Sequence, residues 1–305
     1  MSIMSVVRSK LSVKVSLTLA VVLLVPTALA AAYITLHQTQ QMEDMTLEKT
    51  RLAATLGARQ FGDVLDGAID SGALGVNDVF DENYVEIKGF DFAGKPKYHT
   101  RYDAFLDPVV LVFEDKFLDS EDIVFAIGVD RNGYLPTHNS RFQKPLTGDP
   151  QKDLVGNRTK RKFDDPVGLA AAQNLEPGKL QIYKRDTGET MWDVSSPIYV
   201  KGKHWGGFRI GVSMERIEAR KRALLTALLA AFTVFALVSV GTIFVVIRQA
   251  MKPVLALTEA ADQISLGEGL EAPIRSTSVD EIGRLTKSID RLRASMKAAM
   301  SRLGQ

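Results

Sequence analysis

The sequence predicts two membrane-spanning helices that enclose an α+β domain, followed by a separate helical module. Two uncharged apolar runs carry the first part of this prediction. The run at 223–247 has about 25 residues and the run at 15–36 about 22, enough at ~1.5 Å per residue to cross a hydrocarbon core of ~30 Å. The segment between them has about 185 residues, the size of an ordinary domain. The polar stretch after the second run has a helical pattern of its own.

The composition excludes several classes of function. The chain of 305 residues has a formal net charge of +2, so it lacks the basic excess that a nucleic-acid partner requires. It has no cysteine, which excludes disulfides, thiolate nucleophiles and cysteine-bound metal clusters. Catalytic motifs of the phosphate-loop, Gly-x-Ser-x-Gly and His-Glu-x-x-His types are missing, and the histidines lack metal-ligand spacing. We therefore expect no enzyme, no metal and no cofactor.

The flanking charges set the expected topology. Arg8, Lys10 and Lys14 precede the first run, so residues 1–14 are expected in the cytoplasm. Ala-Leu-Ala at 28–30 leaves a cleaved signal peptide as an alternative, although the run continues to residue 36, as an uncleaved anchor does. Both interpretations place residues 37–222 outside the cytoplasm. Three basic residues at 220–222 lie at the outer end of the second run and oppose the positive-inside rule.

The domain at 37–222 reads as a long helix followed by short antiparallel strands. Helical spacing continues from 37 to about 73, and a second helix is expected at 104–117. Strands are expected at 84–87 and 123–129, and the latter ends at Asn132-Gly133, a strong hairpin signal that predicts a return strand through 134–135. Two further hairpins are expected, one joining 180–183 to 191–194 and the other joining 196–199 to 205–212. This mixture of elements predicts an α+β fold.

Four stretches of this domain resemble the sensor region of a group of bacterial chemoreceptors. They are Gly-Tyr-Leu-Pro-Thr-His-Asn at 133–139, Asn-Arg-Thr-Lys-Arg at 157–161, Arg-Asp-Thr-Gly-Glu at 185–189 and His-Trp-Gly-Gly-Phe-Arg at 204–209. That region is similar to the Cache (PAS-like) sensor fold, in which a long amino-terminal helix backs an antiparallel sheet that holds a small ligand. The resemblance implies a sensor in the periplasm, anchored in the bacterial inner membrane.

The same stretches supply candidate ligand-binding residues. A pocket for a small carboxylate or an amino acid needs guanidinium groups, neutral hydrogen-bond donors and aromatic walls. The alternative for the basic cluster at 157–161 is a structural loop fixed by backbone hydrogen bonds and surface ion pairs. The residues that meet the three requirements are Tyr134, His138, Asn139, Arg158, Arg161, Tyr183, Asp186, Trp205 and Arg209.

The tail after the second run contains two amphipathic helices. The first starts a new register at Lys252-Pro253 and ends at Gly267, and a connector follows at 268–277. The second has apolar residues in heptads and starts with Ser-Val-Asp-Glu at 278–281, which matches a capping box. Pro253, Gly267 and the Asp280-Glu281-Ile282-Gly283 start closely resemble a HAMP domain, expected at 248–301 with a short tail at 302–305. Such helices bury their apolar stripes in a parallel four-helix bundle, which implies a homodimer.

We therefore expect a homodimeric transmembrane sensor that binds a small extracellular ligand. Its signal is expected to pass through Pro253, Gly267, Asp280, Glu281 and Gly283 to a separate cytoplasmic partner, because no output domain follows residue 301. Two alternatives fit this end of the sequence, a natural receptor without its own output domain and a shortened product. The alternative is a membrane scaffold that senses nothing and organises chemoreceptors or kinases through its HAMP-like helices.

Overall fold

The computed structural model describes residues 11–89, 94–185 and 188–303. The chain divides into two compact units, one of residues 36–225 and the other of residues 1–35 with 226–305. Two helices are long and apolar enough to cross a membrane, α2 (Leu11–Asp70) and α7 (Met214–Ser265). Each predicted span is therefore part of a longer helix.

The unit of residues 36–225 is built on an antiparallel sheet in the order β3-β8-β7-β6. Its strands are β3 (Ile123–Asp130), β6 (Lys179–Lys184), β7 (Thr190–Val200) and β8 (Lys203–Ser213). The β6–β7 and β7–β8 pairs are the two predicted hairpins, and β7 joins segments that were expected as separate strands. The predicted class, a long amino-terminal helix with an antiparallel sheet, is confirmed.

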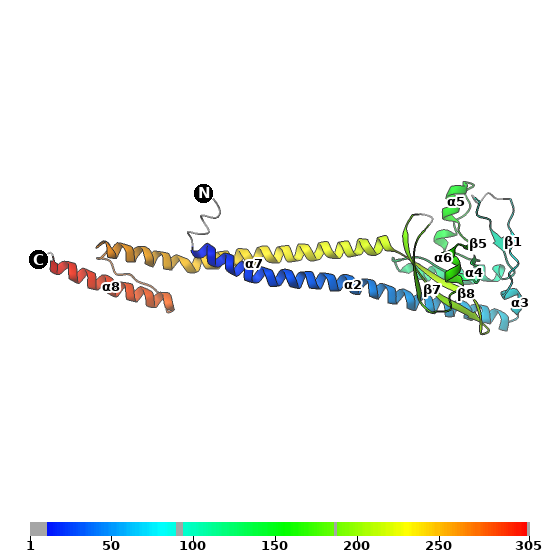
Figure 1. Cartoon of the computed structure of the whole chain (residues 1–305), viewed down its shortest axis with the longest axis horizontal. Helices are drawn as coiled ribbons and strands as arrows, with labels where there is room; N and C mark the ends of the chain where they lie inside the picture. Colours follow the sequence, from blue (N-terminus) through cyan, green and yellow to red (C-terminus); the bar gives the residue numbers. More distant parts are fainter. Residues whose placement is uncertain (1–10, 90–93, 186–187, 304–305) are drawn as a thin grey trace. The chain divides into compact units, whose positions relative to one another are not determined.

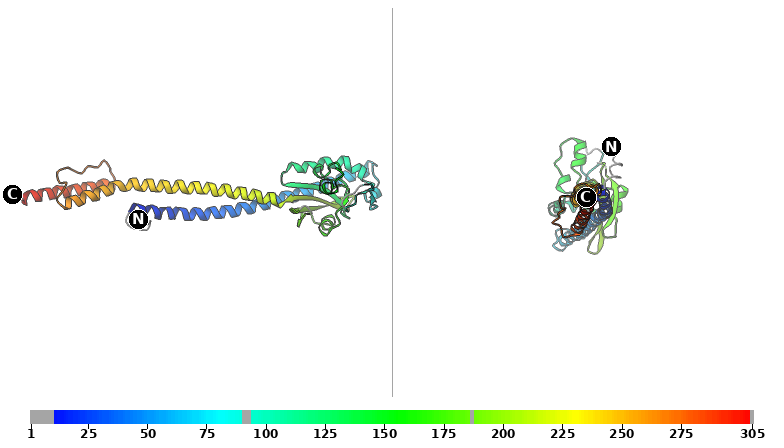
Figure 2. Two further views of the ribbon diagram at one scale, coloured as in Figure 1. Left: turned by 90° about the horizontal axis from the view of Figure 1, so that it is seen from above. Right: turned by 90° about the vertical axis from the view of Figure 1, so that its left-hand side faces the viewer.

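The carboxyl-terminal part of α2 packs on one face of this sheet (Figures 1 and 2). Phe208, Ile210 and Val212 of β8 are buried there together with apolar residues of α4 (Asp103–Lys116). The helix approaches closely at Gly57, because a Cβ atom at this position would lie 2.2 Å from Cε1 of Phe208. Side chains alternate along a strand, so Arg209 belongs to the opposite face of the sheet.

Short elements cover that opposite face. Helix α6 (Pro166–Ala172) approaches β8 so closely that a Cβ atom on Gly207 would lie 2.5 Å from the carbonyl oxygen of Ala171. The remaining short elements of the domain, on either side of the sheet, are α3 (Val76–Val79), β1 (Val85–Glu86), β2 (Tyr98–His99), η1 (Phe117–Asp119), β4 (Tyr134–Leu135), η2 (Ser140–Phe142), α5 (Pro150–Gly156) and β5 (Arg161–Lys162).

The hairpin predicted at Asn132-Gly133 is wrong in its pairing. A tight turn does form, with the Gly133 amide donating to the Asp130 carbonyl oxygen at 2.9 Å. However, β3 pairs with β8, and β4 pairs with β5. The other edge of β3 is already occupied, because its amides at 126 and 128 donate to the side chains of Asn139 (2.7 Å) and Glu114 (3.0 Å).

The basic residues at the start of α7 have acidic partners within the same unit. Arg220 contacts Asp122 at 2.7 Å and Glu121 at 3.2 Å. Lys221 pairs with Glu218 at 3.0 Å and also with Glu43 of α2. Local carboxylates therefore balance charges that otherwise oppose the expected orientation of the second span.

The other unit contains the end of α7 and helix α8 (Glu281–Leu303). The expected helix start at Lys252-Pro253 is wrong, because α7 continues through Pro253 to Ser265. Gly267, with φ of +81°, follows the helix in the left-handed conformation that favours glycine. A connector returns to α8, and Arg293 of α8 donates to the Leu270 carbonyl oxygen of that connector at 2.6 Å. Helix α8 lies beside the end of α7 (Figures 1 and 2).

Candidate functional site

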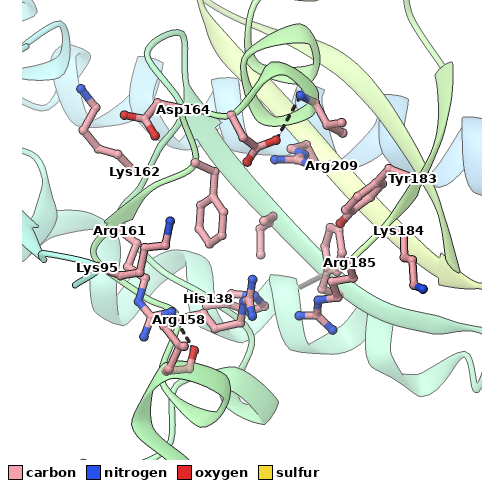
Figure 3. A pocket seen from close by; sticks show the side chains of 16 residues that line it. Lys95, His138, Arg158, Arg161, Lys162, Asp164, Tyr183, Lys184, Arg185 and Arg209 are labelled. Carbon is pink, nitrogen blue, oxygen red and sulfur yellow. Dashed lines mark hydrogen bonds between the residues drawn. The ribbon is translucent and has the colours of Figure 1, made fainter. Parts of the chain in front are cut away.

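A cavity of about 590 Å³ lies on the face of the sheet opposite α2 (Figure 3). Strands β3 and β8 supply its floor, and β6 with the 154–167 segment supplies its walls. This volume suits a small organic molecule. The lining residues are Lys95, Phe125, Ile127, His138, Leu154, Arg158, Arg161, Lys162, Phe163, Asp164, Asp165, Val167, Tyr183, Lys184, Arg185 and Arg209.

The cavity is strongly basic. In the described part of the chain, seven lysine and arginine side chains line it, against the two carboxylates of Asp164 and Asp165. Asp165 also caps α6, accepting hydrogen bonds from the amides of Val167 (3.1 Å) and Gly168 (3.0 Å). The excess of cations, several in the form of planar guanidinium forks, suits a ligand with carboxylate or phosphate groups.

Arg209 is held in the cavity floor by a buried carboxylate. Its Nη2 atom lies 2.5 Å and its Nε atom 3.1 Å from Oδ2 of Asp193, and the two side chains are 5% and 0% exposed. Burial alone would lower the pKa of Arg209, but the charge and hydrogen bonds of Asp193 raise it above its ordinary value. The guanidinium therefore stays charged and fixed in direction.

Arg158, Arg161 and Arg185 surround the cavity from two sides. In Figure 3, Arg158 and Arg161 lie on one side, Arg185 and Tyr183 on the other, with His138 between them. Arg161 is oriented by hydrogen bonds to the carbonyl oxygens of α5 at 153 (3.1 Å) and 154 (2.7 Å). The guanidinium carbon of Arg185 lies 4.5 Å from the ring centroid of Phe142, and that of Arg158 lies 5.5 Å from Phe163. These cation–π contacts hold both guanidinium groups against apolar walls.

His138 supplies a neutral polar group among these arginines. It is 2% exposed, and its Nδ1 atom has no hydrogen-bond partner in the described part of the chain. Burial, with the charges of Arg158 and Arg185 next, lowers the pKa of His138 well below its ordinary value. Burial also raises the pKa of Tyr183, which stays a phenol. The cavity therefore combines fixed cations with neutral groups that donate or accept hydrogen bonds.

Five of the predicted ligand-binding residues line this one cavity: His138, Arg158, Arg161, Tyr183 and Arg209. Their role in ligand binding stays a prediction, but their convergence is what a common site requires. Lys160 in the same loop instead forms ion pairs with Asp103 at 3.1 Å and Asp107 at 2.7 Å. The alternative of a structural loop at 157–161 therefore applies to this residue.

Three other predicted residues lie elsewhere, with partners of their own. The Tyr134 hydroxyl donates to Asp103 at 2.7 Å, and the Trp205 indole donates to the Val79 carbonyl oxygen at 2.8 Å. The side-chain oxygen of Asn139 accepts a hydrogen bond from the Ala126 amide of β3, and its side-chain nitrogen donates to the Glu114 carbonyl oxygen at 2.7 Å. These contacts satisfy the polar atoms that were expected to face a ligand. Asp186 lies outside the described residues.

Sequence reasoning missed Phe125, Ile127 and Arg185 as lining residues. Alternate residues of a strand point to the same face, so the position of Phe125 and Ile127 on β3 could have predicted that they line a cavity together. Arg185 belongs to a stretch that resembles chemoreceptor sensors, but it was expected only as part of a hairpin turn. Its side chain is 5% exposed.

The predicted relay residues occupy the helix ends of the carboxyl-terminal unit. The expected capping box with Ser278 as cap is wrong, because α8 begins at Glu281. Oδ1 of Asp280 accepts hydrogen bonds from the amides of Ile282 (3.0 Å) and Gly283 (3.1 Å), which makes Asp280 the cap. Gly283 fits tightly, since a Cβ atom there would lie 1.9 Å from the Ser278 carbonyl oxygen.

We predict that Asp280→Ala destabilises the first turn of α8 by about 1 kcal/mol, the usual value of a lost aspartate cap. Hydrogen exchange of the amides at 282 and 283 should then speed up about fivefold, as that free energy implies. Glu281→Ala is the control, because Glu281 makes only an exposed contact with Arg284 at 4.0 Å. Faster exchange in the control and not in Asp280→Ala would contradict the assignment.

Over about three fifths of its length the chain is similar to solved structures of low sequence identity. No curated protein matches the chain. An extracellular ligand binding receptor from Desulfohalobium retbaense DSM5692 is 14% identical with a TM-score of 0.30, over 62% of this chain and 27% of that one. The sensory domain of the Campylobacter jejuni chemoreceptor Tlp3 is 12% identical with a TM-score of 0.26, over 59% of this chain and 65% of that one. The chain thus covers less than two thirds of either structure.

The carboxyl-terminal unit has a family match. Residues 245–298 match the HAMP domain family, which confirms the resemblance predicted from Pro253, Gly267 and the Asp280-Glu281-Ile282-Gly283 start. The matched residues include the end of α7, the connector and most of α8. This part of the chain is a HAMP domain, and together with the two candidate spans it fits a transmembrane sensor.

Proposed function

We propose that the chain is a non-enzymatic, chemoreceptor-like transmembrane sensor whose Cache-like domain binds a small organic anion in the periplasm. The protein is proposed to span the bacterial inner membrane as a homodimer and to pass its signal through the HAMP domain to a separate cytoplasmic partner. The observation that carries this proposal is the arginine-lined cavity, in a chain that also has two candidate spans and a HAMP domain.

The charges of the cavity favour an anion with two or more carboxylates over an amino acid. An amino acid needs a carboxylate for its ammonium group, and among the described residues the lining offers those of Asp164 and Asp165. Both are exposed, and Asp165 already caps α6. The deeper carboxylate of Asp193 is paired with Arg209. A dianion would instead meet guanidinium groups on both sides of the cavity, as Figure 3 shows.

Two connections link the cavity to α7. Arg209 lies on β8, and β8 ends at Ser213, directly before α7 begins at Met214. On β3, Phe125 and Ile127 follow the residue pair 121–122, which contacts Arg220 of α7. A ligand that draws these strands together would therefore act on α7 at two points. The ligand can shift the receptor from one conformational state to another only to the extent that it binds the two states with different affinity.

The apolar surface of the HAMP helices supports the proposed homodimer. Leu285 and Leu292, in one of the predicted heptad rows of α8, are 43% and 58% exposed in the single chain. Leu255 of α7 is 62% exposed. A second copy that brings the same helices alongside would bury these side chains in a four-helix bundle.

We predict that Arg158→Ala strongly reduces the thermal stabilisation of the full chain by its anionic ligand. Dicarboxylates, tricarboxylates, amino acids and amines are screened for a shift in the midpoint of unfolding, which rises when a ligand binds only the folded state. Removing the Arg158 guanidinium should lower affinity by about tenfold or more, the value of a hydrogen bond to a charged group.

Arg131→Ala is the matched control, because Arg131 is an exposed arginine of the same domain that pairs with Glu82 at 2.6 Å and does not line the cavity. An unchanged shift in Arg158→Ala would remove Arg158 from the site. No stabilisation by any compound would favour the scaffold alternative, in which the HAMP helices act without a ligand.

A further inference from the structure

Lys97 is a buried lysine that contacts the loop of residues 157–161, which carries Arg158 and Arg161, from outside the cavity. It is 4% exposed, and it does not line the cavity. Its ammonium group donates to the Asn157 carbonyl oxygen at 3.2 Å, to the Thr159 carbonyl oxygen at 2.7 Å and to the Asn157 side-chain oxygen. These acceptors immediately precede and follow Arg158, so one ammonium group ties both sides of that residue.

The loop needs such a tie because its backbone is unusual. Lys160 adopts φ of +63°, a conformation that non-glycine residues rarely take. The loop is further held by the amide of Tyr98, which donates to the Lys160 carbonyl oxygen at 2.8 Å, and by the bridge between Lys97 and Arg161. The result is that the arginine side chains at 158 and 161 line the cavity while the carbonyl groups at 157 and 159 face Lys97.

We propose that Lys97 is a positioning residue of the anion site, whose ammonium group sets the loop so that Arg158 and Arg161 present their guanidinium groups to the ligand. This proposal rests on the proposed function, since it assigns Lys97 to the same cavity. It adds a requirement for a charged ammonium group at a residue that does not itself line the cavity. The three oxygen acceptors given above, all from described residues, match the three protons of an ammonium group, whereas a neutral amine has only two.

The charge state of Lys97 should make binding depend on pH. Burial, followed by the charges of Arg161 and Lys160, lowers the pKa of Lys97 to about 7, against the opposing effect of Asp153. The ammonium form and its third hydrogen bond are therefore lost as the pH rises through about 7. Asp153 stays ionised because hydrogen bonds, the largest from the Thr147 amide, lower its pKa. Affinity for an anion should fall between pH 6.5 and 8.

The test compares Lys97→Met with wild type and with Lys152→Met in the full chain. Lys152 is a matched control, because it is 74% exposed and pairs with Asp149 at 3.4 Å on nearby α5. The probe is succinate, whose carboxyl groups are ionised across this pH range. We expect Lys97→Met to weaken succinate binding about tenfold at pH 6.5, as for a lost hydrogen bond to a charged group, and to remove the pH dependence.

Hydrogen exchange at residues 157–161 is measured without ligand as a second readout. Lys97→Met should speed this exchange, whereas Lys152→Met should not. Equal exchange in all three proteins, or faster exchange with unchanged succinate affinity and pH dependence, would overturn the proposal. If wild type binds no succinate, the ligand class is wrong, and the exchange result still decides whether Lys97 holds the loop.

Discussion

Asp193→Ala is expected to lower the free energy of unfolding of the sheet domain by about 3–5 kcal/mol, the usual result of removing one partner of a buried ion pair. Asp193 is completely buried, and Arg209 is 5% exposed. Without the carboxylate, the Arg209 guanidinium stays in a site that already holds Arg158 and Arg185. Its charge is then unpaired and, at 5% exposure, poorly hydrated, whereas the unfolded chain solvates it fully.

Tryptophan fluorescence of the full chain measures this change directly. The chain has two tryptophans, and Trp192 and Trp205 both lie in the sheet, on β7 and β8. Denaturant curves followed by their fluorescence therefore report the sheet domain and not the membrane helices. Asp70→Ala is the control, because Asp70 is 69% exposed in its pair with Lys201 and should contribute less than about 1 kcal/mol. Equal midpoints for the two variants would show that the buried pair is not needed for stability.

The sequence predicts most of the fold because its signals are local. The apolar runs, the period of α2 and the turns after β6 and β7 each depend on residues near one another in the chain. The pairing of β3 with β8 joins segments about 80 residues apart, and no local pattern encodes it. The Asn132-Gly133 signal was misleading for the same reason. It predicts a turn, but the Asn139 and Glu114 side chains decide which partner β3 accepts.

The candidate site is predicted less completely than the fold. Arg158 and Arg209 are predicted because a small anion needs guanidinium groups and both arginines lie in stretches that resemble chemoreceptor sensors. Tyr134 and Trp205 carry an apolar ring with one polar atom, so they suit a ligand cavity and a satisfied core equally well. The distinction depends on Asp103 and Val79, which lie far from them in sequence. Likewise, Lys97 becomes part of the site only when the loop at 157–161 folds against it.

Glu114→Gln is expected to stabilise the domain relative to wild type at pH 8 while changing it little at pH 5. Glu114 is fully buried on α4, where its Oε1 atom accepts the Gly128 amide. Burial raises the pKa of Glu114 well above its ordinary value, against the lowering effect of that amide. The folded state therefore keeps a proton that the unfolded state releases above about pH 4.3. Stability from this group is greatest at low pH and falls as the pH rises, by at most about 1.4 kcal/mol per pH unit.

Glutamine keeps the oxygen that accepts the Gly128 amide and has no proton to lose. The stability of the variant therefore lacks the fall with rising pH that Glu114 causes in wild type. Fluorescence-monitored unfolding at several pH values gives the difference between variant and wild type, in which contributions from Lys97, His138 and Asp130 cancel. Glu82→Gln serves as the control, because Glu82 is an exposed glutamate of the same domain, with 48% of its side chain accessible. A difference that stays constant from pH 5 to 8 would mean that Glu114 ionises normally inside the fold. A widening difference would show that β3, the strand that carries Phe125 and Ile127 to the cavity, is held at its outer edge by a protonated carboxyl group.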